Sequence, residues 1–174
     1  MRWLPFQLNP DLPEGGIPRA DYVARKFGPG HKGVNERVVA IGRQLGIGFE
    51  YEKMKVQPNT LNAHRLMLFA EQAGKQGELA EELFRAHFTE GANLTDPETL
   101  ADVAARAGLE RKAVADFIAS GEGRDTIARA DLEARNAGIG GVPFFIFNHK
   151  IGVSGAQDPE ALLQAMEQAL EEQG

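Results

Sequence analysis

The run G-G-V-P-F-F-I-F-N, from Gly140 to Asn148, constrains the fold of this chain more than any other stretch. A proline has no backbone N–H to donate to a strand ladder, so it is confined to a strand's first residue, to an edge or to a bulge. The aromatic and β-branched residues that follow favour a strand over Val142–Phe147. We therefore predict a strand that begins at a tight proline loop, with a cis peptide bond between Val142 and Pro143.

A second strand and a helix are predicted after this one. Residues 148–150 are expected to turn the chain into a strand at Ile151–Ser154, which gives an antiparallel hairpin. Asp158-Pro159 is typical of a helix start. The expected helix carries apolar residues on its faces: Leu162, Leu163, Met166 and Leu170. Strand, strand and helix after a proline loop form the closing half of a thioredoxin-like fold.

The long middle part of the chain, residues 18–137, is predicted to be a run of helices. Apolar residues recur there at helical spacing, and glycines such as Gly74 and Gly108 end the helices. Two explanations stay open for the helix start near residue 95: a capping box of Thr95 and Glu98, or Asp96 as the cap with Pro97 at the first helical position. Before this region, residues 1–10 look extended and residues 11–18 form a loop.

Composition excludes several classes of protein. The chain has 174 residues, enough for one domain with a sizeable core. A net charge of −6 argues against a nucleic-acid or anionic-membrane surface, and no stretch reaches the length of a transmembrane helix. The N-terminus lacks the apolar core of a signal peptide, so we expect a cytoplasmic protein. The chain has no cysteine, which excludes a disulfide or a thiolate metal site within it.

Neither a metal nor another cofactor is expected. The four histidines lack metal-ligand spacing, and the glycines at 138–141 precede a strand and do not open a phosphate-binding helix. His64 lies at helical spacing from Leu61 and Leu68, so we expect it to pack on a partly apolar helix face. A role in a substrate pocket is the alternative. The same argument applies to His87, whereas His31 and His149 are expected to be exposed.

The segment G-V-P-F-F-I-F-N-H-K-I-G-V-S-G-A-Q, Gly141 to Gln157, resembles the cis-proline hairpin of DsbA-like proteins. The resemblance is greatest to FrnE-type thiol–disulfide oxidoreductases, near the 2-hydroxychromene-2-carboxylate isomerases. Arg2–Pro10 resembles the second core strand of these proteins and its exit. Pro58–Leu66 and Phe88–Gly91 resemble parts of their helical insertion. The similar segments occur in the same order along nearly the whole chain.

This resemblance implies an α/β, thioredoxin-like fold in a single DsbA-like domain, residues 1–174. Residues 1–17 and 138–174 would form the thioredoxin-like part, and residues 18–137 the large helical insertion. The implied partners are protein or peptide thiols and disulfides. Substrate binding is implied at five residues, among which Pro143 would present the backbone of Val142 to an extended substrate by strand-like pairing. These are Val142 and Pro143 of the proline loop, with Phe6, Asn9 and His64.

The sequence departs from the family in one respect. In these proteins a strand, a C-x-x-C motif and a helix precede the strand that begins here at Arg2, and this chain starts after them. Thiol exchange requires a thiolate. We therefore expect an N-terminally truncated member of this family. The given chain would contain no catalytic residue and would be inactive in thiol exchange. An alternative explanation is that Met1 is an internal residue of a longer protein.

Two other functions stay open. One is a glutathione-dependent enzyme similar to the 2-hydroxychromene-2-carboxylate isomerases, and the other is a degenerate, non-enzymatic thioredoxin-like module that binds peptides. The codons upstream of Met1 would distinguish the three functions. An in-frame C-x-x-C would support the oxidoreductase, an in-frame serine-containing equivalent would support the isomerase, and a stop codon would support the non-enzymatic module. Strands at Arg2–Leu8 and Val142–Phe147 would lack a partner between them. We therefore expect a two-fold homodimer, or a monomer in which these strands pair directly.

Overall fold

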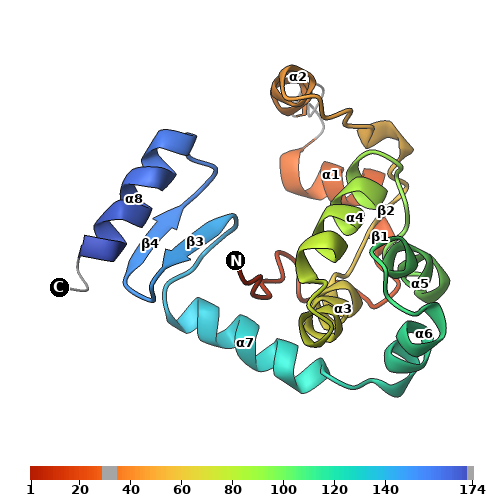
Figure 1. Cartoon of the computed structure of the whole chain (residues 1–174). Helices are drawn as coiled ribbons and strands as arrows, with labels where there is room; N and C mark the ends of the chain where they lie inside the picture. Colours follow the sequence, from red (N-terminus) through yellow and green to blue (C-terminus); the bar gives the residue numbers. More distant parts are fainter. Residues whose placement is uncertain (29–34, 172–174) are drawn as a thin grey trace. The chain divides into compact units, whose positions relative to one another are not determined.

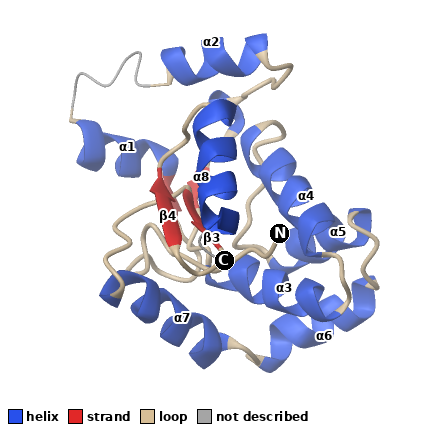
Figure 2. Ribbon diagram, turned by 60° about the vertical axis from the view of Figure 1, so that its left-hand side comes forward, coloured by secondary structure: helices blue, strands red, loops and turns tan. Residues whose placement is uncertain are grey.

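The computed structural model describes residues 1–28 and 35–171. His31, which is expected to be exposed, lies outside the described residues. Clustering of the chain gives two compact units, Met1–Ile127 and Ala128–Gly174. Helices account for most of the described chain, and the strands form two small antiparallel sheets (Figure 1, Figure 2). The predicted grouping of residues 1–17 with 138–174 stays a prediction.

The element order follows the predicted run of helices and the final hairpin and helix. The first unit contains β1 (Ile17–Pro18), α1 (Arg19–Phe27), α2 (Glu36–Gln44), the 3-10 helix η1 (Tyr51–Lys53), β2 (Val56–Gln57), α3 (Leu61–Gln72), α4 (Gln76–Phe88), α5 (Pro97–Arg106) and α6 (Arg111–Ser120). Helix α7 (Arg124–Asn136) includes the boundary between the units. The second unit then contains β3 (Phe144–Phe147), β4 (Ile151–Ser154) and α8 (Pro159–Glu171).

The core of the first unit lies between α3, α4, α5 and α6. Helix α3 contacts α4 and α6, and α5 contacts the same two helices. The side chains of Leu66, Leu79, Leu100 and Val114 are fully excluded from solvent, and alanines fill the positions between them. Small residues at these positions let the helix backbones approach closely, so a few leucines are enough to fill the interior.

Arg65 of α3 is fully buried and closes one end of this core. Its guanidinium donates to the carbonyl oxygens of Phe117, Ile118 and Glu122 at 2.8, 3.1 and 2.6 Å. The last carbonyls of a helix have no partner within it, and Arg65 satisfies those at the end of α6. Burial lowers the pKa of Arg65. The side chain therefore ties α3 to the end of α6.

The start of α5 decides between the two capping arrangements. Asp96 Oδ2 accepts hydrogen bonds from the backbone N–H of Thr99 at 3.0 Å and from its hydroxyl at 2.6 Å, with Pro97 at the first helical position. These two bonds hold the pKa of Asp96 below its usual value. Thr95 instead bonds to Asn93. The cap is Asp96, because its carboxylate reaches two donors of one residue.

The predicted strand at Arg2–Leu8 is wrong, because the structure assigns no strand to these residues. The backbone N–H of Trp3 donates to Gln76 Oε1 at 2.8 Å, and Gln76 Nε2 donates to the Trp3 carbonyl at 3.0 Å. One side-chain amide thus satisfies the donor and the acceptor that a neighbouring strand would take. Phe6 and Gln7 are buried, so the segment is packed against the first unit without a sheet.

A short sheet occurs where the sequence predicted a loop. Ile17 of β1 pairs with Gln57 of β2 in an antiparallel register. Gly16 precedes it with φ 72°, and a Cβ there would lie 2.4 Å from the Gln57 carbonyl oxygen. Only glycine fits this turn.

The hairpin of the second unit forms where it was predicted, with the turn at residues 148–150, but its first strand begins at Phe144 and not at Val142. Phe144 pairs with Ser154, and Phe147 with Ile151. Asn148 and His149 have φ values of 50° and 57°, the left-handed pair of a type I′ turn. Helix α8 packs against both strands and buries only two of its residues, Ala165 and Ala169 (Figure 1).

Candidate functional site

The proline loop leads directly into β3. The Val142–Pro143 peptide bond is cis, and both residues are exposed. The Pro143 carbonyl accepts a hydrogen bond from Gly155 N–H at 2.8 Å, which extends the hairpin ladder by one residue beyond Phe144. The backbone of Val142 therefore lies at the open end of the hairpin.

The outer edge of β3 carries backbone groups that do not face β4. In an antiparallel pair, successive residues direct their N–H and C=O groups to opposite edges. The bond from Gly155 N–H to the Pro143 carbonyl shows which residues hydrogen-bond to β4. The backbone N–H and C=O groups of Phe145 and Phe147 point to β4, whereas those of Phe144 and Ile146 point to the outer edge. Among the described strands, β3 pairs with β4 alone. This outer edge can accept one more strand.

Side-chain packing fixes the shape of this hairpin. Gly152 lies under the ring of Phe144, where a Cβ would come within 2.9 Å of Phe144 Cζ. The rings of Phe145 and Phe147 are parallel to within 4°, with centroids 6.4 Å apart. Ile146 is 47% exposed. The hairpin therefore has rigid aromatic side chains beside an outer edge that is open.

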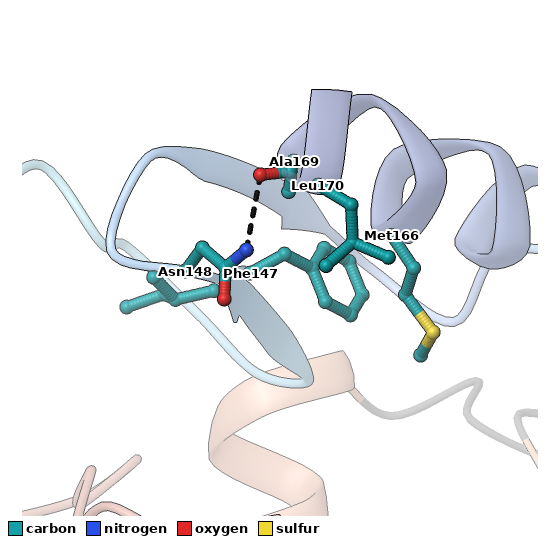
Figure 3. A pocket seen from close by; sticks show the side chains of 6 residues that line it. Phe147, Asn148, Met166, Ala169 and Leu170 are labelled. Atoms are coloured by element: carbon teal, nitrogen blue, oxygen red, sulfur yellow. Dashed lines mark hydrogen bonds between the residues drawn. The ribbon is translucent and has the colours of Figure 1, made fainter. Parts of the chain in front are cut away.

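A shallow hollow lies where the turn of the hairpin meets α8 (Figure 3). Its volume is about 230 Å³, and most of its lining is apolar. Asn148 Nδ2 donates to the Ala169 carbonyl at 3.0 Å and so satisfies an acceptor in the last turn of the helix. Figure 3 shows the Phe147 ring beside Met166 and Leu170. The hollow has no titratable side chain in its lining.

The other three predicted site residues belong to the first unit. Phe6 is 8% exposed and is part of the core. The Asn9 carbonyl accepts from Leu12 N–H at 3.3 Å in a turn. His64 lies half-buried on α3, as expected for a histidine on a partly apolar face. Val142 and Pro143 are adjacent in the second unit, so the five candidates are divided between the two units.

An aromatic cluster in the first unit was not predicted from the sequence. Tyr51 stacks on Phe49 with centroids 5.5 Å apart, and both rings contact Phe88 edge-on. Burial raises the pKa of Tyr51 and lowers that of His87, whose ring contacts Phe88. These residues are scattered over a helix and a loop, so neither strand nor helix periodicity could have joined them.

The chemistry available to the chain is limited by its side chains. The sequence has no cysteine, and residues 1–28 and 35–171 contain no group of three or more histidine and carboxylate side chains that could hold a metal ion. None of the helices in these two ranges is long and apolar enough to cross a membrane. The exposed His149 in the hairpin turn confirms one expectation. What the proline loop offers is backbone pairing and apolar contact.

Comparison with known proteins assigns the family. The sequence model of the DSBA-like thioredoxin domain matches residues 1–167. The chain belongs to this DsbA-like family. Its structure is similar to the crystal structure of a probable DsbA oxidoreductase from Streptomyces coelicolor, with a TM-score of 0.87 and 27% sequence identity. The alignment covers 96% of this chain and 74% of that one. No curated protein sequence matches the chain significantly.

The family confirms the thioredoxin-like α/β fold with a large helical insertion. Sequence reasoning named Val142 and Pro143 but missed Phe144 and Ile146, whose backbone forms the outer edge. The outward direction of their backbone groups follows from the alternation along a strand, so the predicted hairpin was a signal for it. The role of Gln76 was also missed, because no local pattern shows that a side-chain amide will pair with Trp3.

Proposed function

We propose that this chain is the substrate-binding part of a FrnE-type thiol–disulfide oxidoreductase and is itself inactive in thiol exchange. Family membership supports the oxidoreductase class, and the absence of cysteine from the sequence supports inactivity. Exchange proceeds through attack of a thiolate on a disulfide sulfur, so the thiol has to come from outside these 174 residues. The proposed substrate is an extended peptide segment of a protein thiol or disulfide.

The observation that carries this proposal is the outer edge of β3. Phe144 and Ile146 direct backbone donors and acceptors away from β4, next to the exposed Val142. An extended peptide can add to such an edge as a further strand, with main-chain hydrogen bonds that do not depend on its sequence. Such pairing would let the chain bind protein or peptide substrates that differ in sequence.

Amide hydrogen exchange of the full chain tests the binding step. The probe is carboxymethylated insulin B chain, an extended peptide with blocked thiols. We expect it to slow exchange at the amides of Phe144 and Ile146. The amides of Gly152 and Ser154, which face the outer edge of β4, are the matched control and should not change. Equal protection of both edges, or none at β3, would contradict strand addition.

Removal of one outward N–H gives a second test. Ile146→Pro deletes a donor on the outer edge of β3 and leaves the bonds to β4 in place. Ser154→Pro deletes the equivalent donor on β4. We expect the first substitution to weaken binding of the B chain at least tenfold and the second to leave it unchanged. Similar effects of the two would indicate general loss of the hairpin.

The chemical step is tested separately. The purified chain should not reduce insulin disulfides in the presence of dithiothreitol faster than dithiothreitol alone, because it has no residue that can form the mixed disulfide. Acceleration by a preparation whose mass confirms the cysteine-free chain would overturn the proposed inactivity while leaving peptide binding untouched.

A further inference from the structure

Helix α2 presents an apolar face that no described residue of its own unit covers. Val38, Ile41 and Leu45 are spaced i, i+3 and i+7 over the helix and its C-cap, and their exposed fractions are 43, 46 and 71%. The only buried residue of the helix is Gly42, on an adjoining face, where a Cβ would come within 2.5 Å of the Phe49 ring. The helix is thus held on one side, with its apolar stripe free.

Helix α8 presents a stripe of the same spacing. Leu163, Met166 and Leu170 are also at i, i+3 and i+7, with exposed fractions of 55, 45 and 62%. Figure 3 shows Met166 and Leu170 over the hollow next to Phe147. Ile146 also lines the hollow. We call this hollow, together with the apolar stripe of α8, the α8 groove. Grooves of this kind commonly bind an amphipathic helix that has three apolar side chains at the same spacing.

The charges beside the two stripes are opposite. Helix α8 carries Glu160, Glu167 and Glu171 and no basic residue, a net charge of −3. Helix α2 has two arginines, Arg37 and Arg43, against one glutamate, a net charge of +1. Arg37 is adjacent to Ile41 around the helix and flanks the stripe of α2, whereas Arg43 lies on the opposite side, one turn from Ala40. Two copies of α8 would repel each other, and the side of α2 that carries Arg37 would attract α8.

We propose that the occupant of the α8 groove is α2 of a second copy of this chain. Under two-fold symmetry the contact forms twice, since α2 of each copy meets α8 of the other. The arrangement covers both apolar stripes and brings Arg37 of α2 to the glutamates of α8. It uses no residue of Arg2–Leu8 and, of the two residues at the outer edge of β3, only Ile146, whose side chain lines the hollow.

Single cysteines test the contact directly, because the chain has none of its own. Ile41→Cys and Met166→Cys are prepared as separate proteins, mixed and mildly oxidised. We expect a disulfide between the two variants and little of it in either variant alone. Ala40→Cys and Gln168→Cys, on the opposite faces of the same helices, are the matched pair and should not crosslink.

Two outcomes would overturn the proposal. One is a mixture that crosslinks no more than the matched pair. The other is a disulfide that forms only in a double variant with Ile41→Cys and Met166→Cys on one chain, when that variant remains a monomer. In that case the two stripes meet within one molecule.

Sedimentation at micromolar concentration gives an independent reading. We expect a dimer of the 18.9 kDa chain that weakens as salt is added. Leu170→Lys places a positive charge opposite the basic helix and should weaken the dimer at least tenfold. Leu4→Lys alters an equally exposed leucine, 61% against 62%, outside both stripes and should have no effect. A wild-type monomer, or equal effects of the two substitutions, would refute the α2–α8 contact.

Discussion

The two compact units of this chain treat their apolar side chains differently. In the first unit Leu66, Leu79 and Leu100 are fully buried among four helices. In the second, α8 buries two alanines, while Leu163 and Leu170 are more than half exposed. The apolar composition of the helices is similar, so the difference lies in what each helix has to pack against.

The number of surrounding elements explains this difference. Helices α3–α6 surround a common interior, so they bury most of their apolar side chains, although Phe84 of α4 stays 51% exposed. Among the described residues of its own unit, α8 packs against a two-stranded hairpin, which covers one side of the helix. Hairpins of this size are marginal without further strands or helices. The four-helix core of the first unit is therefore closed, whereas α8 in the second unit keeps an exposed apolar face.

The largest expected effect is the difference in stability lost when a leucine is replaced by alanine in the core of the first unit or on α8 of the second. Leu100→Ala should lower the free energy of unfolding by about 2–5 kcal/mol, because it opens a cavity in a closed core. Leu163→Ala should change it by less than about 0.5 kcal/mol when measured on the monomer at low concentration. Urea denaturation monitored by circular dichroism compares them. A large loss for Leu163→Ala would show that the face of α8 is covered within the monomer.

A smaller loss is expected when the buried cation of the first unit is replaced. Arg65→Lys keeps the charge but cannot reach three carbonyl oxygens in a fork, so about 2 kcal/mol of stability should be lost. Arg111→Lys, whose exposed guanidinium pairs with Glu98, is the control and should cost less than about 0.5 kcal/mol. The midpoint of urea unfolding measures both. Equal small losses would mean that α3 and α6 do not depend on Arg65.

The smallest effect is a gain in the second unit. His149 holds a positive φ that glycine adopts freely, so His149→Gly should raise the stability of the hairpin by roughly 0.5 kcal/mol. Asn148→Gly should instead lower it, because the bond from Asn148 to the Ala169 carbonyl is lost. Amide exchange of Phe145 and Ile151 reports the hairpin alone. Changes in the same direction for both variants would contradict this account of the turn.

Local patterns predicted much of the fold. The hairpin around residues 144–154, the helix after Pro159 and the run of helices before residue 137 appear as expected. Each of these depends on turn chemistry or periodicity within about a dozen residues. The proline loop was also found locally, because few residues other than proline limit the backbone so strongly.

The predictions that failed or were missing depended on residues far apart in the sequence. Residues 2–8 are extended and apolar, as a strand would be, and only the amide of Gln76, more than 70 residues from Trp3, decides that they do not join a sheet. The β1–β2 sheet joins segments about 40 residues apart. No local pattern contains such pairings, since a backbone group can be satisfied by any donor or acceptor that the fold brings near.

The sequence by itself determined the family, the final hairpin and helix, and the absence of a thiol, because these follow from residue identity and local spacing. Only the tertiary structure decided which apolar stripes are covered. The stripe of α3 and that of α8 are both amphipathic in sequence, but burial depends on how many neighbours surround a helix. That number is a property of the packed molecule, and it leaves α2 and α8 with apolar faces for a partner.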